Sequence, residues 1–212
     1  MKKFLLVLAT LALSLTAFAQ KPEEIVSKME EQMALHEGEG LIWTMDLKLP
    51  LLGTVTSNIR SLGKKTRMEA AVKGANTVTW MDETTSWTYT ADSNILEIEN
   101  VKIEKAKDDA KDDAKDDVKM FRDVTKGYDV TLASETEKEW FFLCKKSKSN
   151  KEKNAPRTVE LVIAKGTYYP VRLTAKLKGV SMTFRNVAFG VSEREVTFHP
   201  EDYPNAIVQD KR

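Results

Sequence analysis

The residues that could do chemistry are few and scattered along this 212-residue chain. Beyond the first 19 residues it holds two histidines, His36 and His199, and one cysteine, Cys144. No metal-binding or nucleophile motif surrounds either histidine, so neither is expected to be catalytic. Cys144 lies in a strand-like run, which favours a small buried hydrophobic residue over a nucleophile. The sequence therefore predicts no catalytic residue, no metal site, no cofactor and no enzyme activity.

Paired carboxylates gather in residues 105–119, where the unit Lys-Asp-Asp-Ala repeats. A calcium loop needs a turn glycine and a terminal glutamate, and this run has neither. Acid-base catalysis needs carboxyl groups in a sheltered cleft, which a solvated run does not provide. We interpret the run as a solvated helix or a mobile insert.

The N-terminus has the three parts of a secretory signal peptide. Lys2 and Lys3 precede an apolar run over residues 4–15, and Ala17 and Ala19 form a small-x-small cleavage site. The apolar run is shorter than the ~20 residues that a membrane-spanning helix needs. We expect cleavage after Ala19 and a periplasmic product, residues 20–212, that forms a single domain. The whole chain holds 33 basic and 32 acidic residues, a near balance that favours no nucleic-acid partner.

The positions of the apolar residues predict the elements. Residues 22–35 favour a helix, because Ile25, Met29 and Met33 recur every four residues. From Leu41 the period becomes two, and about ten short strands follow, ending with a strand over residues 195–198. The predicted fold class is α+β with β dominant, a large curved antiparallel sheet with an N-terminal helix.

The predicted sheet carries more apolar surface than one short helix can cover, and uncovered apolar surface marks a ligand site. The alternative is that the same residues form an ordinary core. Methionines would give adaptable lining for acyl chains. The predicted lipid-binding residues, all at strand spacing, are Trp43, Met45, Met68, Val78, Trp80, Trp87, Tyr89, Phe141, Leu161, Leu173, Met182 and Phe184. A later cluster, Met120, Phe121 and Val124, is either ordinary packing or a lid over the cavity.

Several features together resemble one family, the LolA-like periplasmic carriers of outer-membrane lipoproteins. They are the signal peptide, the early helix, the long meander, the hairpin over residues 77–89 with its Trp87-x-Tyr89 arm, the closing Phe198-His-Pro200, and the terminal Val208-x-Asp210-x-Arg212. The resemblance spans the whole mature chain, but it rests on order and spacing rather than on one diagnostic motif.

The resemblance implies an open half-barrel with the N-terminal helix and a lid helix on its concave face. It also implies a monomeric chaperone that takes lipoprotein acyl chains from an inner-membrane ABC transporter complex and passes them to an outer-membrane acceptor. Family members lock the lid with a strand arginine, for which Arg60 is the first candidate here and Arg67 the second. The alternative is a lipid-sensing or lipoprotein-sensing regulatory protein with the same fold. A small periplasmic hydrolase is the third class.

Overall fold

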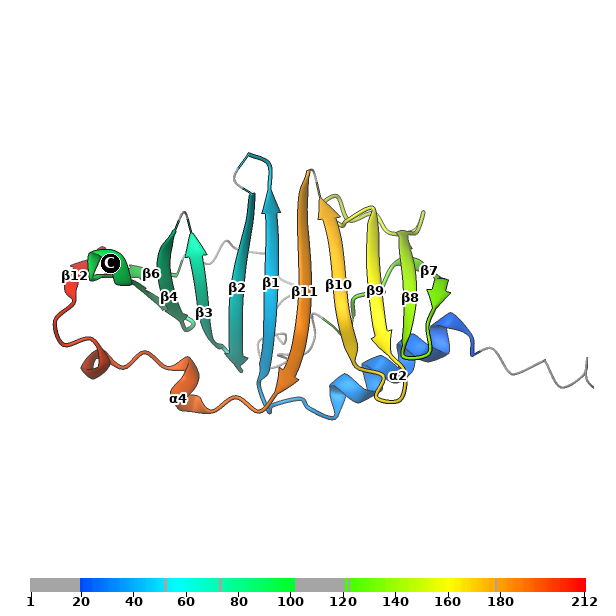
Figure 1. The fold of residues 1–212 in the computed structure, drawn as a ribbon, viewed down its shortest axis with the longest axis horizontal. Helices are drawn as coiled ribbons and strands as arrows, with labels where there is room; N and C mark the ends of the chain where they lie inside the picture. The colour runs from blue at the N-terminus through cyan, green and yellow to red at the C-terminus, as the bar shows by residue number, and fades with distance from the viewer. Residues whose placement is uncertain (1–19, 52, 73, 102–120, 122, 178) are drawn as a thin grey trace, which may run out of the picture.

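The computed structural model describes residues 20–51, 53–72, 74–101, 121, 123–177 and 179–212. They form one large curved sheet, accompanied by the helix α2 (Pro22–Ala34) and the short helix α4 (Glu193–Val196) (Figure 1). The expected signal peptide and the Lys-Asp-Asp run lie outside the described residues, as does Met120 of the expected lid cluster. No helix among the described residues is long and apolar enough to cross a membrane.

Helix α2 begins and ends within one residue of the range expected from the sequence. Pro22 stands in its first turn, where its missing N–H is not needed, and Glu23 and Glu24 face the positive end of the helix dipole. Its apolar side is narrow and fully buried, formed by Ile25, Val26, Met29 and Met33. The helix is therefore held by packing on the sheet rather than by its own propensity.

Twelve strands form the sheet, and all neighbours are antiparallel except β12 and β6. The strands are β1 (Leu41–Leu49), β2 (Gly53–Leu62), β3 (Lys65–Val72), β4 (Ala75–Met81), β5 (Thr85–Thr90), β6 (Ile95–Asn100), β7 (Tyr128–Glu135), β8 (Glu139–Lys146), β9 (Thr158–Ala164), β10 (Pro170–Leu177), β11 (Val180–Phe189) and β12 (Ile207–Asp210).

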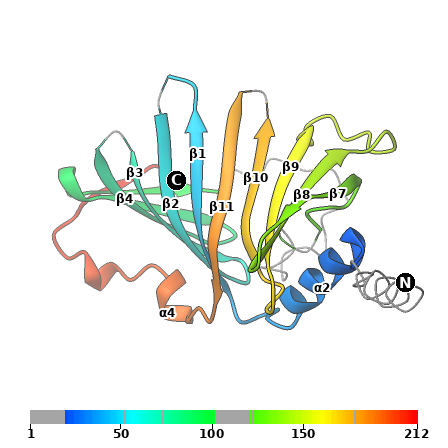
Figure 2. The same ribbon diagram turned by 45° about the vertical axis from the view of Figure 1, so that its right-hand side comes forward.

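The strand order is β12-β6-β5-β4-β3-β2-β1-β11-β10-β9-β8-β7. The chain therefore runs outward from β1 to β6, then returns inward from β7 to β11, so the first and the eleventh strand pair at the centre. The sheet curls without closing, and β12 and β7 remain as its two edges (Figures 1 and 2). This confirms the predicted β-dominant open half-barrel.

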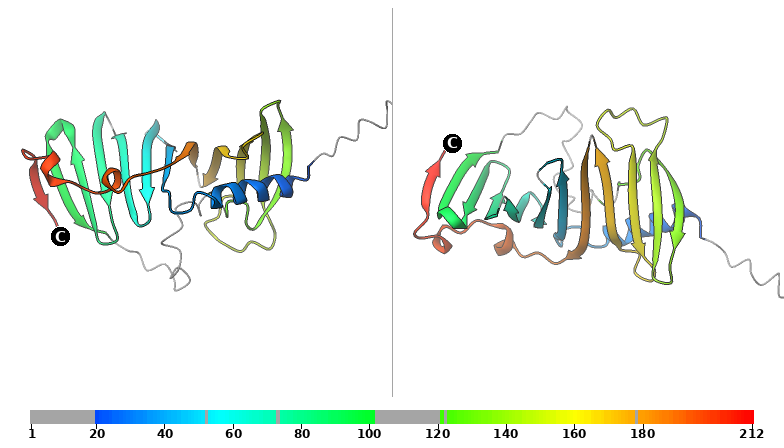
Figure 3. Two further views of the ribbon diagram at one scale, coloured as in Figure 1. Left: turned by 90° about the horizontal axis from the view of Figure 1, so that it is seen from below. Right: turned by 45° about the horizontal axis from the view of Figure 1, so that its top comes forward.

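Helix α2 lies along one half of the sheet, while the chain after β11 runs along the other half (Figure 3). We call this chain, residues 190–206, the C-terminal segment; it contains α4 and the single turn η3 (Pro200–Asp202). The predicted strand over residues 195–198 is wrong. Ser192 and Glu195 form a capping box, and these reciprocal hydrogen bonds start a helical turn at Glu193.

Gly40 allows the start of β1 and the residues just after β11 to pack closely together. Gly40, just before β1, has a φ of +76°, and a Cβ there would lie 2.6 Å from the Cβ of Val191 and 2.7 Å from the carbonyl oxygen of Ser61. The N–H of Val191 also donates to the carbonyl of Glu39 at 2.8 Å. The start of the C-terminal segment is thus packed directly on the backbone that enters β1.

Candidate functional site

The face of the sheet that contacts α2 is the inner face, and the opposite one is the outer face. The antiparallel register assigns side chains to each, because directly paired residues share a face. Trp43 pairs with Ile59, and Ile59 pairs with Met68, so all three are on one face of β1, β2 and β3. Trp43 packs against the core that contains the α2 side chains, which identifies this face as the inner one.

The inner face of β8, β9 and β10 forms the closed part of the core. Phe142, Leu161 and Leu173 are neighbours across these strands, and all three are buried beneath α2 and Phe121. Phe121 has no exposed surface, and Val124 packs against the same core. Of the predicted lid cluster, these two residues therefore act as packing in this structure.

Next to the closed core lies a strip of apolar side chains that is only half buried, which we call the inner strip. Met45 pairs with Phe184 and Leu47 with Met182, and Met68 continues the same face across β2 onto β3. All five residues are intermediate in exposure, although each points to the face on which the core is built. The inner strip comprises Met45, Leu47, Met68, Met182 and Phe184.

Beyond β3 the inner face is largely polar, and the exposed Met81 at the end of β4 is an exception. From β4 to β5 the same face carries hydroxyl side chains, and the hydroxyls of Thr79 and Thr88 lie 3.1 Å apart across the two strands. Thr77 and Ser86 belong to this face too. An apolar ligand would therefore find its largest contact on the inner strip beside α2, not along the whole half-barrel.

The outer face holds the aromatic residues of the hairpin. Trp80 pairs with Arg67 and with Trp87, and none of these lies on the Met68 face. Phe198 of the C-terminal segment stacks on Trp87, with ring centroids 5.5 Å apart and an interplanar angle of 14°. Tyr203 packs on Tyr89 at 4.5 Å. The aromatic surface of the hairpin is thus covered by the chain's own C-terminal segment.

This placement divides the residues that the sequence grouped as one lipid-binding cavity. The structure brings seven together on the inner face, either in the inner strip or in the core: Trp43, Met45, Met68, Leu161, Leu173, Met182 and Phe184. Five lie on the outer face and are removed from the candidate site: Val78, Trp80, Trp87, Tyr89 and Phe141. Spacing within a strand fixes which residues share a face there, but only the register between strands says which face that is.

The two arginines proposed to lock a lid are also on the outer face. Arg60 and Arg67 pair across β2 and β3, opposite the face that holds Phe121. Arg60 reaches Glu69 and Glu195 at 3.5 Å each, and Arg67 reaches Glu69 at 2.7 Å. The lid-locking role stays a prediction, and among the described residues Arg60 ties the sheet to the C-terminal segment through Glu195.

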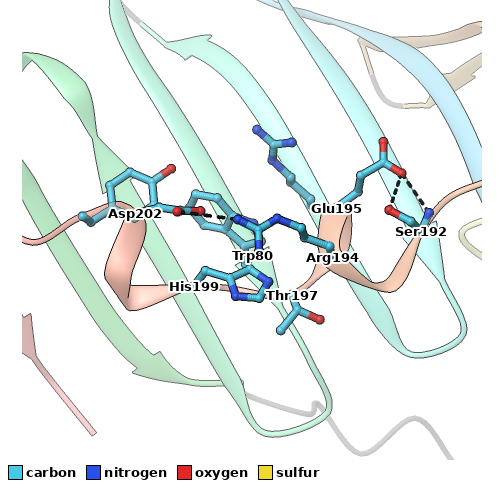
Figure 4. Close-up of a pocket in the computed structure, with 9 residues that line it drawn as sticks. Trp80, Ser192, Arg194, Glu195, Thr197, His199 and Asp202 are labelled. Carbon is cyan, nitrogen blue, oxygen red and sulfur yellow. Dashed lines mark hydrogen bonds and ion pairs between the residues drawn. The ribbon is translucent and has the colours of Figure 1, made fainter.

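A small hollow of about 240 Å³ lies between this segment and the sheet (Figure 4). Its charges are largely paired, since Arg194 lies 3.8 Å from Asp202 and Nδ1 of His199 lies 3.1 Å from Glu201. Trp80 and Tyr203 form its apolar part. The hydroxyl of Ser192 donates to the carboxylate of Glu195 at 2.8 Å in this hollow, and this pair is the capping box that starts α4.

The two other titratable residues considered in the sequence, His36 and Cys144, take part in packing. His36 stacks on Phe189 at 4.0 Å, and its Nε2 lies 2.6 Å from the hydroxyl of Tyr169. Cys144 is fully buried, and burial raises the pKa of its thiol to about 11. Among the described residues, no three His, Cys, Asp or Glu side chains are grouped so as to hold a metal ion.

The turn of the aromatic hairpin is fixed by Asp82. Its carboxylate accepts hydrogen bonds from the N–H groups of Thr84 and Thr85, both at 2.8 Å. Burial works against ionisation of Asp82, but these backbone hydrogen bonds outweigh it and lower its pKa. These hydrogen bonds fix the turn, which holds β4 and β5 in register and places Trp80 and Trp87 together on the outer face.

Comparison with known proteins gives matches among solved structures alone. No family model and no curated protein sequence matches the chain. The matching structures include the Mycobacterium tuberculosis lipoprotein LppX, with 9% identity, a TM-score of 0.48, and 81% of this chain and 98% of that one covered. An uncharacterized conserved protein from Thermus thermophilus has 15% identity, a TM-score of 0.46 and coverage of 89% and 98%.

A LolA superfamily protein from Nitrosomonas europaea also matches, with 8% identity, a TM-score of 0.32 and coverage of 85% and 99%. The chain resembles LolA-like proteins in structure. The TM-scores of these three matches are all below 0.5.

Proposed function

We propose that this protein is a non-enzymatic carrier that binds acyl chains on the inner face of its half-barrel. The observation that carries the proposal is the inner strip, which remains half buried beside the core that α2 covers. Apolar surface that is left open next to a packed core marks a binding site for an apolar ligand.

The ligand class follows from the shape and chemistry of the strip. Its five members stand on β3, β1 and β11, none of them is charged, and three of them are methionines. Methionine side chains adapt to ligands of varied shape, as alkyl chains require. Each methylene that leaves water on the strip contributes about 0.8 kcal/mol, so one long acyl chain can offset the cost of association.

Helix α2 gives the protein a way to enlarge the site. It contacts the sheet through one row of four buried side chains, two of them methionines, Met29 and Met33. A small displacement of α2 would join the inner strip to the core beneath the helix, and the acyl chain would replace the lost contacts. The empty protein keeps this surface covered because exposed apolar area is unfavourable in water.

The biological setting belongs to the same proposal. A signal peptide ending at Ala19 would deliver the protein to the periplasm, where lipoprotein acyl chains need a carrier between membranes. An inner-membrane ABC transporter complex would be the donor and an outer-membrane protein the acceptor, as the resemblance implies. The protein would act as a monomer and would need no cofactor.

The direct experiment is mass spectrometry of lipid that co-purifies with the secreted protein without detergent. We expect an acylated lipid or lipoprotein fragment at close to one molecule per chain. A protein that emerges free of lipid, and that takes up no fluorescent acyl probe afterwards, would overturn the proposal. Transfer of the bound lipid to acceptor membranes distinguishes a carrier from a sensor, because a sensor would retain it.

A further inference from the structure

The end of the sheet that lies away from α2 and α4 is strongly basic. The loop that joins β8 to β9, with its flanking residues 145–157, contains six lysines and arginines but a single acidic residue, Glu152. The whole chain has a formal net charge of only +1. One short stretch thus carries a net charge of +5 in a protein that is otherwise slightly acidic.

The basic loop encloses a hollow rather than projecting freely. The hollow has a volume of about 560 Å³ and is lined by Lys146, Lys153, Ala155, Arg157, Lys176 and Leu177. The base of the loop is fixed by hydrogen bonds, because the N–H of Lys146 donates to the carbonyl of Arg157 at 3.0 Å. The hydroxyl of Tyr128 also donates to the carbonyl of Pro156 at 3.0 Å.

Few carboxylates neutralise these cations. Lys176 lies 3.3 Å from Glu160, but both side chains of this pair are largely exposed, so it is weak. Lys146 donates to the backbone carbonyl of Glu152, not to its carboxylate. In the part of the chain that the structure describes, no carboxylate forms an ion pair with Lys153 or Arg157. Among the described residues, carboxylates thus leave the charges of Lys153 and Arg157 without neutralisation.

The same end of the sheet carries an exposed apolar residue. The turn between β1 and β2 reaches this end (Figure 1), and Leu51 at its tip has a relative exposure of 106%. Pro50 lies beside Gly179 of the β10–β11 turn, so the leucine tip and the basic hollow belong to one rim. Apolar tips among cations are typical of surfaces that meet a membrane interface, where the leucine enters the acyl boundary and the cations face the headgroups.

We propose that this rim, defined by residues 50–51, 145–157 and 176–177, docks on the surface of an anionic phospholipid bilayer. Five of the six basic residues in the loop are lysines. Lysine offers a hydrated point charge on a flexible stem, whereas one tightly held phosphate is better served by the fork of arginine. A layer of many headgroups fits a spread of lysines. The docking does not depend on what the inner strip binds.

The test is sedimentation of the full mature protein with phosphatidylcholine vesicles that either contain or lack phosphatidylglycerol. We expect binding only to the anionic vesicles, and weaker binding as salt is raised. The double variant Lys148→Gln/Lys153→Gln should bind about 25-fold more weakly, since each lysine near such a surface contributes roughly fivefold. Leu51→Asn, which suits the φ of +66° at this position, should also weaken binding.

The matched control removes two exposed lysines away from the rim, Lys21 before α2 and Lys138 in the β7–β8 turn. The variant Lys21→Gln/Lys138→Gln has the same net charge as the rim variant and should keep the affinity of the wild type. An equal loss in both variants would overturn the proposal, because net charge alone would then explain binding. Equal binding to vesicles without phosphatidylglycerol would overturn it as well.

A discrete phosphate site is the remaining outcome that contradicts docking. Inorganic phosphate, added at constant ionic strength, would then displace the protein from vesicles, whereas a diffuse surface contact should resist it. Acyl-probe uptake is measured on the same rim variant and should be unchanged. If the wild type binds anionic vesicles but takes up no acyl probe, the carrier proposal is contradicted and this one stands.

Discussion

At the scale of single residues, the groups that stabilise the fold are distinct from those that line the proposed acyl-chain site. Asp46 and Arg185 are an example of the first kind. Nε of Arg185 donates to Asp46 at 2.8 Å, and the hydroxyl of Thr56 donates to the same carboxylate at 2.7 Å. The pair lies on the outer face across β1 and β11, away from the inner strip.

The Asp46 pair predicts a specific dependence of stability on pH. The hydrogen bond from Arg185 lowers the pKa of Asp46 in the folded protein. A lowered folded pKa gives stability that is present above the unfolded pKa, near 3.9, and is lost as pH falls through the folded value. Asp46→Asn should therefore lower the free energy of unfolding by roughly 0.5–1 kcal/mol at neutral pH, and hardly at all at strongly acidic pH.

Urea unfolding of the wild type and Asp46→Asn at neutral and acidic pH measures this difference. Arg185→Gln and the double variant complete the cycle, and the double variant should be little less stable than either single one. A difference between wild type and Asp46→Asn that persists undiminished in acid would contradict the assignment.

Cys144 gives a second prediction at this scale. Because its thiol is buried with a pKa of about 11, reaction with a thiol reagent should be roughly a hundredfold slower in the native protein than in the unfolded chain. Ser149→Cys adds an exposed thiol on the β8–β9 loop and should react rapidly. Equally fast labelling of Cys144 in native wild type would show that β8 is not packed as described.

At the scale of elements, the sequence predicted α2 and most strands, because each follows a local period. The prediction was wrong where local hydrogen bonds, which hydrophobic spacing does not reveal, decided the structure. The capping box of Ser192 and Glu195 forms α4 where a strand was expected. The prediction also missed β12, four exposed residues that form a strand only because β6 offers its edge. Local sequence patterns could not predict which face of the sheet Trp80 occupies, because that depends on the register across many strands.

The connection between α2 and β1 carries a prediction of its own. Gly40→Ala should destabilise the protein by about 1–3 kcal/mol, because its Cβ would overlap Val191 and the carbonyl of Ser61 at a left-handed φ. Gly38 also has a positive φ, but no atom lies within 4 Å of a Cβ there. Gly38→Ala is thus the matched control and should cost about 1 kcal/mol, the strain of the left-handed backbone that both positions share, so that Gly40→Ala loses more. Chemical denaturation of both variants measures the difference, and equal losses would contradict the close packing at Val191.

At the scale of the whole molecule, the two faces of the half-barrel are covered by different segments of the chain. The C-terminal segment covers the aromatic hairpin on the outer face, with Phe198 and Tyr203 as its contacts. The inner face is covered by α2 over the core but is left half buried at the inner strip. The sequence identified many of the residues involved, and the register decides which of them can meet a ligand.

Two adjacent alanines on β3 point to opposite faces of the sheet, so the same substitution at each position tests whether acyl chains bind on the inner face. Ala70 pairs with Ser57, which pairs with Met45, so Ala70 faces the inner side. Ala71 pairs with Asn76 and faces the outer side, where it is exposed. An aspartate at either position adds the same charge to the same strand.

Titration of a fluorescent acyl probe into wild type, Ala70→Asp and Ala71→Asp is the most direct measurement. Thermal unfolding of each variant confirms that the sheet is intact. We predict that Ala70→Asp weakens probe binding at least tenfold, because a charge beside the inner strip must lose water when the acyl chain binds. Ala71→Asp should bind as the wild type does. Unchanged binding in Ala70→Asp, or a greater loss in Ala71→Asp, would contradict acyl-chain binding on the inner face.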